Sequence, residues 1–204
     1  MAPAEPFDLP AFMLSNFNRV DFGPDLFGQR PTGIRFEIGA EQVSRAARLF
    51  DFVFAESPDC ILISQDWVTD KTLDGRFTPL FQTPGIYTPD SLRLQTLDVS
   101  PLDETAYRLT WTRLPPASIN ALAMFQGIAN REQQGSPKIS SGVFAIAPGS
   151  KIILHMYDDR GLDIVAAELN TLRSLYESFD SWVLDNQRHR IAFRFTNALS
   201  TPDD

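Results

Sequence analysis

The sequence predicts an α+β protein built as a single domain, with a mixed or mainly antiparallel central sheet flanked by a few helices. Stretches in which every second residue is apolar alternate along the chain with stretches in which apolar residues recur at helical spacing. The 15 prolines are typical of a segmented, loop-rich chain and disfavour a helical bundle. A chain of 204 residues suits one domain, which buries roughly 70% of the surface exposed by its unfolded form.

Three segments are expected along the chain. Residues 1–30 form a helical, proline-rich N-terminal extension, residues 31–198 form the α+β domain, and residues 199–204 form a frayed C-terminus. Within the extension, Leu9, Phe12, Met13 and Phe17 recur at helical spacing, which predicts a short helix near residues 8–18.

The first part of the domain reads as strand, helix, strand. Apolar residues alternate with charged ones over residues 33–39, which predicts a half-buried strand. One apolar stripe predicts a helix over residues 41–55, and the continuous apolar run Cys60–Ile63 predicts a buried central strand. This order suggests a βαβ-like opening, and an antiparallel return is the open alternative.

The second part of the domain continues with short elements. Residues 66–104 are punctuated by Pro and Gly, so loops and minor strands are expected there. The same periodicity rules predict the remaining elements. They are strands at 105–113 and 141–147, a proline-opened helix over 119–129, a short helix over 170–178, and a closing helix after Asp185 as its N-cap.

Residues 151–166 are the stretch that combines apolar strands with ionisable groups. Two strands, Ile152–Met156 and Leu162–Ala166, are joined by Tyr157-Asp158-Asp159-Arg160-Gly161. Aspartates that bond backbone amides and a Gly161 with positive φ are typical of a tight turn. The alternative is that the carboxylates of Asp158, Asp159 and Asp163 bind a hard divalent cation or supply a general base.

Two other positions add polar groups to this stretch. His155 lies in an apolar strand, either as a hydrogen-bonded structural residue or as a catalytic one. Arg35 and Glu37 share one face of the first strand, either as a surface charge pair or as polar groups directed at a cleft. These positions define a candidate cluster, without an assigned catalytic residue, metal or cofactor: Arg35, Glu37, His155, Tyr157, Asp158, Asp159, Arg160 and Asp163.

Composition limits the possible functions. The formal net charge of -8 disfavours nucleic-acid binding, and it is either a solubility charge or a face complementary to a basic partner. Cys60 is the only cysteine, which excludes an intramolecular disulfide and fits a reducing compartment. The chain shows no signal peptide and no apolar run of membrane-spanning length, so a cytoplasmic protein is expected.

Motifs of common catalytic sites are missing from the sequence. There is no Gly-x-Ser-x-Gly elbow, no His-Glu-x-x-His and no Cys-x-x-Cys, and two histidines are too few for a multi-histidine metal site. Hydrolase and zinc-enzyme chemistry are therefore disfavoured.

The run Tyr157-Asp158-Asp159-Arg160-Gly161-Leu162-Asp163-Ile164, followed by Leu175-Tyr176 and Trp182-Val183-Leu184-Asp185, resembles the C-terminal signature of a bacterial family, domain of unknown function 3885. The segment Gly33–Gly39 and the arginine-bearing helix after it also resemble that family, so that the similarity spans about residues 30–195. The family's closing segment is expected to read Asp-Tyr-Asp-Arg, where this chain has Asp185-Asn186-Gln187-Arg188. The resemblance implies a bacterial cytoplasmic α+β protein and supplies no mechanism.

Two functional hypotheses follow. The first is a non-enzymatic binding protein, an immunity or antitoxin protein whose acidic surface covers a basic toxin. The second is an enzyme or a metal-dependent small-molecule binder that uses Asp158, Asp159 and Asp163. The sequence does not determine the oligomeric state.

Overall fold

The computed structural model describes residues 6–18, 22, 31–39, 43–67, 78–88, 92–99 and 106–197. The rest of the expected N-terminal extension and the expected frayed end at 199–204 lie outside these residues. No helix in the described part of the chain is long and apolar enough to cross a membrane.

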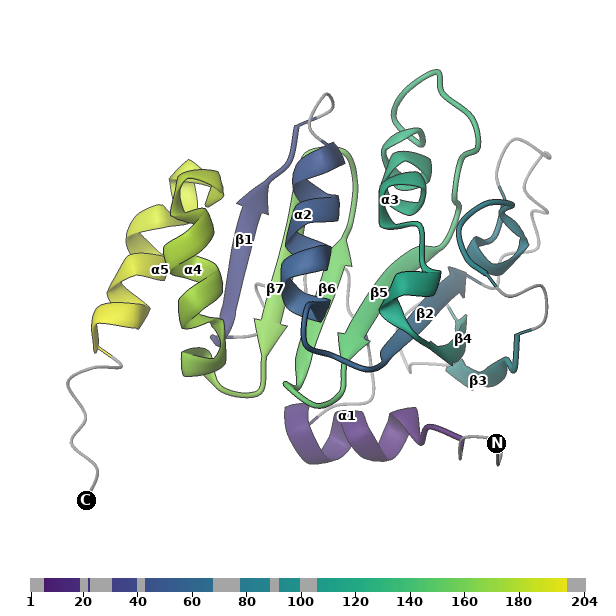
Figure 1. The fold of residues 1–204 in the computed structure, drawn as a ribbon, viewed down its shortest axis with the longest axis horizontal. Coiled ribbons are helices and arrows are strands. Elements are labelled where there is room, and N and C mark those ends of the chain that lie inside the picture. The colour runs from purple at the N-terminus through teal and green to yellow at the C-terminus, as the bar shows by residue number, and fades with distance from the viewer. Residues whose placement is uncertain are drawn as a thin grey trace.

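The described residues form one seven-stranded sheet with the order β1-β7-β6-β5-β2-β4-β3 (Figure 1). Every pair of neighbouring strands is antiparallel, which confirms the predicted α+β class with a mainly antiparallel sheet. The strands are β1 (Gly33–Glu37), β2 (Cys60–Trp67), β3 (Gln95–Val99), β4 (Tyr107–Leu114), β5 (Gly142–Ala147), β6 (Ile152–Met156) and β7 (Gly161–Ala166).

The opening of the domain only partly matches the expected βαβ unit. The alternation of antiparallel neighbours makes β1 and β2 run in the same direction, but β7, β6 and β5 lie between them. Helix α2 (Val43–Phe54) therefore crosses over three intervening strands (Figure 1). Local periodicity predicts β1, α2 and β2, yet it does not report which strands come to lie between them.

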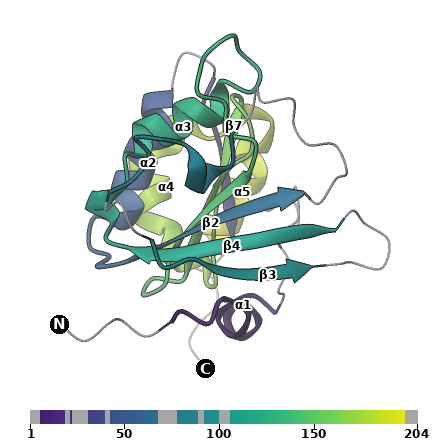
Figure 2. The same cartoon turned by 90° about the vertical axis from the view of Figure 1, so that its right-hand side faces the viewer.

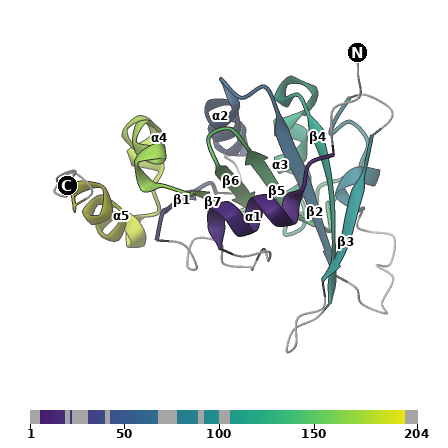
Figure 3. The same ribbon diagram turned by 90° about the horizontal axis from the view of Figure 1, so that it is seen from below.

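Two apolar cores cover the two faces of the sheet. Helices α2, α3 (Ala121–Ala129), α4 (Arg173–Phe179) and α5 (Asp185–Asn197) belong to one face, and α1 (Leu9–Phe17) crosses the other (Figures 2 and 3). Leu9, Met13 and Phe17 of α1 are buried in the second core. Strand β2 contacts both cores and is buried from Cys60 to Gln65, as expected for a central strand.

Two helix starts differ from expectation. The carboxamide oxygen of Asn120 caps α3 by accepting from Ala123 N at 3.1 Å, whereas the preceding prolines lie in a short 3-10 turn at Pro116–Ser118. Asp185 is the first residue of α5 rather than a residue outside it, and its carboxylate pairs with Arg188 at 2.9 Å. Proline and aspartate both mark helix starts, but tertiary context sets the helical position that they occupy.

Candidate functional site

Part of the candidate cluster lies in one row that runs across the sheet. Arg35 of β1 faces Asp163 of β7, Asp163 faces His155 of β6, and His155 faces Phe144 of β5. This row is on the same face as α1, and it changes from charged to apolar as it approaches the centre of the sheet. Strand pairing thus brings Arg35 next to Asp163, which is 128 residues away in the sequence, and places His155 beside the same aspartate.

The Arg35–Asp163 ion pair is bidentate. Arg35 Nε donates to Asp163 Oδ1 at 2.7 Å and Arg35 Nη2 donates to Oδ2 at 2.8 Å. The Asp163 side chain is fully buried, whereas 20% of the Arg35 side chain is exposed. Because both carboxylate oxygens accept from the same guanidinium, the charge of Asp163 is compensated inside the fold.

His155 is held between an aromatic ring and the backbone. Its ring stacks on Phe144, with centroids 4.1 Å apart and an interplanar angle of 15°. Nδ1 lies 2.8 Å from the Val143 carbonyl oxygen, so Nδ1 carries the proton and donates it. Burial lowers the pKa of His155 to about 4, and the charges of Arg131 and Arg35 act in the same direction. The imidazole is therefore neutral at pH 7.

Tyr157 lies next to this row and contacts two of its members, Arg35 and His155. The guanidinium carbon of Arg35 lies 5.1 Å from the centroid of the Tyr157 ring. Burial raises the pKa of Tyr157 to about 12. Arg131, which follows α3, donates from Nη2 to the Tyr157 carbonyl and fixes the backbone at the end of β6.

The carboxylates of the turn do not converge with Asp163. Asp158 Oδ1 accepts from the Arg160 backbone N at 2.8 Å, and its Oδ2 accepts from the Arg160 guanidinium. Asp159 Oδ2 accepts from Gln133 Nε2 at 3.5 Å. Asp158 and Arg160 thus organise the turn itself.

Gly161 has a different role from the one expected. It does not have a positive φ, in contrast to Gly39 and Gly85. A Cβ at Gly161 would lie 1.8 Å from the hydroxyl oxygen of Tyr157. Glycine therefore leaves room for the end of the Tyr157 side chain, which would have to move to admit a Cβ. Glu37, the remaining member of the candidate cluster, is exposed at the end of β1 opposite Gly161.

The described residues contain no group of three or more His, Cys, Asp or Glu side chains that could hold a metal ion. In the candidate cluster, Asp163 is bonded to Arg35 and Asp158 is bonded to Arg160. This arrangement suits a structural network better than metal coordination, which needs several converging oxygen ligands.

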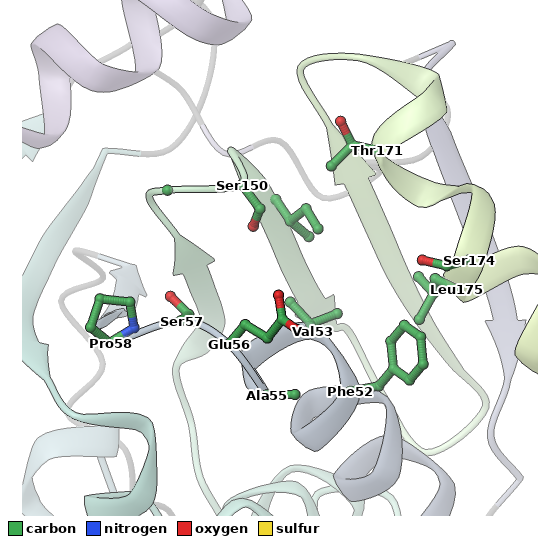
Figure 4. A pocket seen from close by; sticks show the side chains of 12 residues that line it. Phe52, Val53, Ala55, Glu56, Ser57, Pro58, Ser150, Thr171, Ser174 and Leu175 are labelled. Atoms are coloured by element: carbon green, nitrogen blue, oxygen red, sulfur yellow. The ribbon is translucent and has the colours of Figure 1, made fainter.

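A separate cavity of about 570 Å³ lies at the opposite ends of β5 and β6 (Figure 4). It is bounded by the end of α2, by the turn between β5 and β6, and by the start of α4 with the short turn before it. Phe52, Val53, Ile152 and Leu175 supply apolar surface. Its size is within the range of small-molecule sites, roughly 300–1,000 Å³.

Polar groups are grouped at this cavity. The side chains of Glu56, Ser150 and Ser174 point toward the same space (Figure 4). Ser57 and Thr171 add hydroxyl groups. Among the described residues that line the cavity, Glu56 carries the only formal charge. The cavity thus combines apolar surface with several hydrogen-bonding groups and one carboxylate.

A family profile described as "Domain of unknown function (DUF3885)" matches residues 9–187, which is most of the chain. The chain belongs to this family. The matched range of the DUF3885 domain begins with α1 and extends into α5, so it includes most of both cores, the candidate cluster and the cavity. Comparisons with curated proteins and with solved structures gave no match.

Sequence reasoning about the DUF3885 domain missed the cavity and the role of Arg131. The cavity residues come from three segments, 52–58, 149–152 and 171–175. Each segment contains signals of a loop or a helix end, such as Ser57-Pro58, but no spacing rule joins segments so distant in sequence. Only the strand order places the start of β6 near the end of α2.

Proposed function

We propose that this DUF3885 domain is a non-enzymatic binding protein whose binding site is the cavity bounded by α2, the β5–β6 turn and α4. The observation that carries this proposal is the combination of an apolar floor with convergent polar groups in a cavity of about 570 Å³. Sites of this size and composition hold small ligands or single side chains of a larger partner.

The state of the candidate cluster supports a binding role over catalysis there. His155 is buried, neutral and bonded to a backbone carbonyl, so it is poorly placed to exchange protons with a substrate. Burial raises the pKa of the Cys60 thiol well above its ordinary value, which disfavours a thiolate nucleophile. The ionisable groups of the cluster instead stabilise the fold.

A pair of substitutions on α4 tests the binding site. Ser174→Trp places a large ring at the cavity, whereas Ser178→Trp places the same ring one turn further along an exposed part of the same helix. Small-molecule fragments that bind the cavity should shift the NMR signals of the Ser57, Ser150 and Thr171 amides. The Ser174→Trp protein should no longer bind these fragments. Fragments that bind both variants equally well would contradict the proposal.

A basic protein partner is the second function that we propose, as expected for an immunity or antitoxin protein. It is favoured by the location of the acidic excess. The chain has 26 acidic and 18 basic residues, yet acidic and basic residues are nearly equal in number among the described ones. The excess comes largely from other segments, such as Asp103-Glu104 and Asp203-Asp204, and these would attract the partner.

Affinity capture from the native cell tests this second function. A stoichiometric basic protein should be recovered, and its binding should weaken as salt is added because screening reduces attraction between exposed charges. Recovery of no partner at low salt would count against it.

A further inference from the structure

We infer that the cavity selects organic cations, binding an alkylammonium or guanidinium group next to the Glu56 carboxylate with its hydrocarbon part against Phe52 and Leu175. This inference rests on the proposed binding function, and it adds the chemical class of the ligand. The same chemistry is found in small amines and in the Lys or Arg side chains of a protein.

The electrostatics of the cavity favour positive charge from two sources. Glu56 is the only formally charged group among the described lining residues, and it is negative. The cavity is also formed by the C-terminal end of α2, a 12-residue helix with no basic residue in its last turn. A helix C-terminus carries a partial negative charge of roughly half an elementary charge, and no basic side chain in that turn offsets it.

Nearby basic residues do not line the cavity. Lys151 follows Ser150 in the β5–β6 turn but is not part of the cavity wall. Arg173, at the start of α4, donates to Asn170 Oδ1 and lies over the Phe195 ring, on the side of α5. A bound cation would therefore meet a carboxylate and a helix C-terminus without a competing protein cation in the wall.

The apolar surface suits the hydrocarbon part of such a ligand. Phe52 is 39% exposed, and its ring is held edge-on against Phe179, with centroids 5.2 Å apart. An exposed aromatic face attracts cations through its quadrupole as well as burying carbon atoms. The hydroxyl groups of Ser57, Ser150, Thr171 and Ser174 provide acceptors for the N–H groups of the cation.

Three probes with the same four-carbon chain test this inference on the full chain: butylammonium, 1-butanol and butanoate. Their dissociation constants are measured from the NMR shifts of the cavity amides at low ionic strength. Butylammonium should bind most tightly and butanoate most weakly. Added salt should weaken the binding of butylammonium more than that of butanol, because screening acts on the charged probe.

Matched variants then locate the charge effect. Glu56→Gln should weaken butylammonium binding about three- to fivefold, the size of effect expected for an exposed ion pair, and leave butanol binding unchanged. Glu177→Gln removes an exposed carboxylate of α4 outside the cavity and should change neither. Phe52→Leu should weaken butylammonium binding more than butanol binding.

The outcomes separate the two proposals. Equal affinity for the three probes, or unchanged butylammonium binding by Glu56→Gln, would overturn the inference about cations while leaving the cavity as a binding site. No shift of the cavity amides by any probe would overturn both. If butylammonium is the preferred probe, a further comparison identifies the source of the cation. Tighter binding of an arginine-containing peptide than of butylguanidinium would indicate a protein side chain, and tighter binding of butylguanidinium would indicate a small organic cation.

Discussion

At the scale of the residue, removing one member of the Arg35–Asp163 pair should lower the stability of the protein strongly. Asp163→Asn keeps the shape of the side chain but leaves Arg35 without its bidentate acceptor in a largely buried position. The free energy of unfolding, measured by urea denaturation, should fall by about 3 kcal/mol, because removing one member of a buried, bidentate ion pair is strongly destabilising.

Two other variants check that reasoning. Asp98→Asn breaks a pair with Arg108 in which both side chains are more than half exposed, and it should leave the urea midpoint nearly unchanged. The double variant Arg35→Met/Asp163→Leu removes both charges and should recover part of the loss. If Asp163→Asn and Asp98→Asn cost the same, burial does not determine the value of the pair.

His155 should make the stability depend on pH. The folded protein holds the pKa of His155 at about 4, below the ordinary value of 6.5, mainly through burial. The unfolded chain therefore binds the proton first as the pH falls, and stability is lost between about pH 6.5 and pH 4. The loss approaches about 3 kcal/mol at the acid end, since one pKa unit corresponds to about 1.4 kcal/mol.

Paired histidine variants isolate this effect from the titration of carboxylates. His155→Gln removes the titrating ring, so the difference in stability between pH 7 and pH 4.5 should become smaller than in the parent protein. His189→Gln removes the other histidine, which is exposed on α5, and is the matched control for the loss of an imidazole. An unchanged pH profile in the His155→Gln protein would contradict the expected role of burial.

At the scale of the element, the turn between β6 and β7 depends on close approach of Tyr157 to the backbone. Gly161→Ala should lower the thermal midpoint because the added Cβ would lie 1.8 Å from the Tyr157 hydroxyl and the ring has to move. Gly149→Ala, in the turn between β5 and β6, meets no atom within 4 Å and should have little effect. If the Tyr157 contact is the cause, Gly161→Ala should cost much less in a Tyr157→Ala background.

Elements could be predicted from the sequence wherever the signal is local. The two strands around Tyr157–Gly161 were predicted correctly because the turn residues and the flanking apolar runs are contiguous. The position of β1 next to β7 could not be predicted, because it depends on pairing between residues that are 128 positions apart, such as Arg35 and Asp163. Gly161 was expected in the turn but is the first residue of β7, and the reason for the glycine is a side-chain contact that composition does not reveal.

At the scale of the whole molecule, the polar row and the cavity lie at opposite ends of the central strands. The polar row Arg35–Asp163–His155 is at one end of β6 and β7 on the α1 face, and its groups are engaged with one another or with the backbone. The cavity is at the other end of β5 and β6, bounded by α2 and α4. The sequence draws attention to the first region because its ionisable residues are adjacent, whereas the second is assembled only by the fold.

The location of the acidic excess gives a prediction for the molecule as a whole. Neutralising Asp103, Glu104, Asp203 and Asp204 to Asn or Gln removes four negative charges outside the described residues. Neutralising Asp51, Glu168, Glu177 and Asp180 removes the same number from exposed positions of the described residues. The two proteins therefore have the same net charge with different distributions.

If the acid-rich segments attract a basic partner, the first protein should lose more affinity for a short polylysine peptide than the second, measured by titration at low salt. Attraction between exposed charges falls off within about 10 Å at 0.1 M salt, so the positions of the charges affect binding as well as their sum. Equal losses would indicate that only net charge acts, which would remove the support that the charge distribution gives to the basic-partner proposal. The cavity proposal would be unaffected, because none of these eight positions lines the cavity.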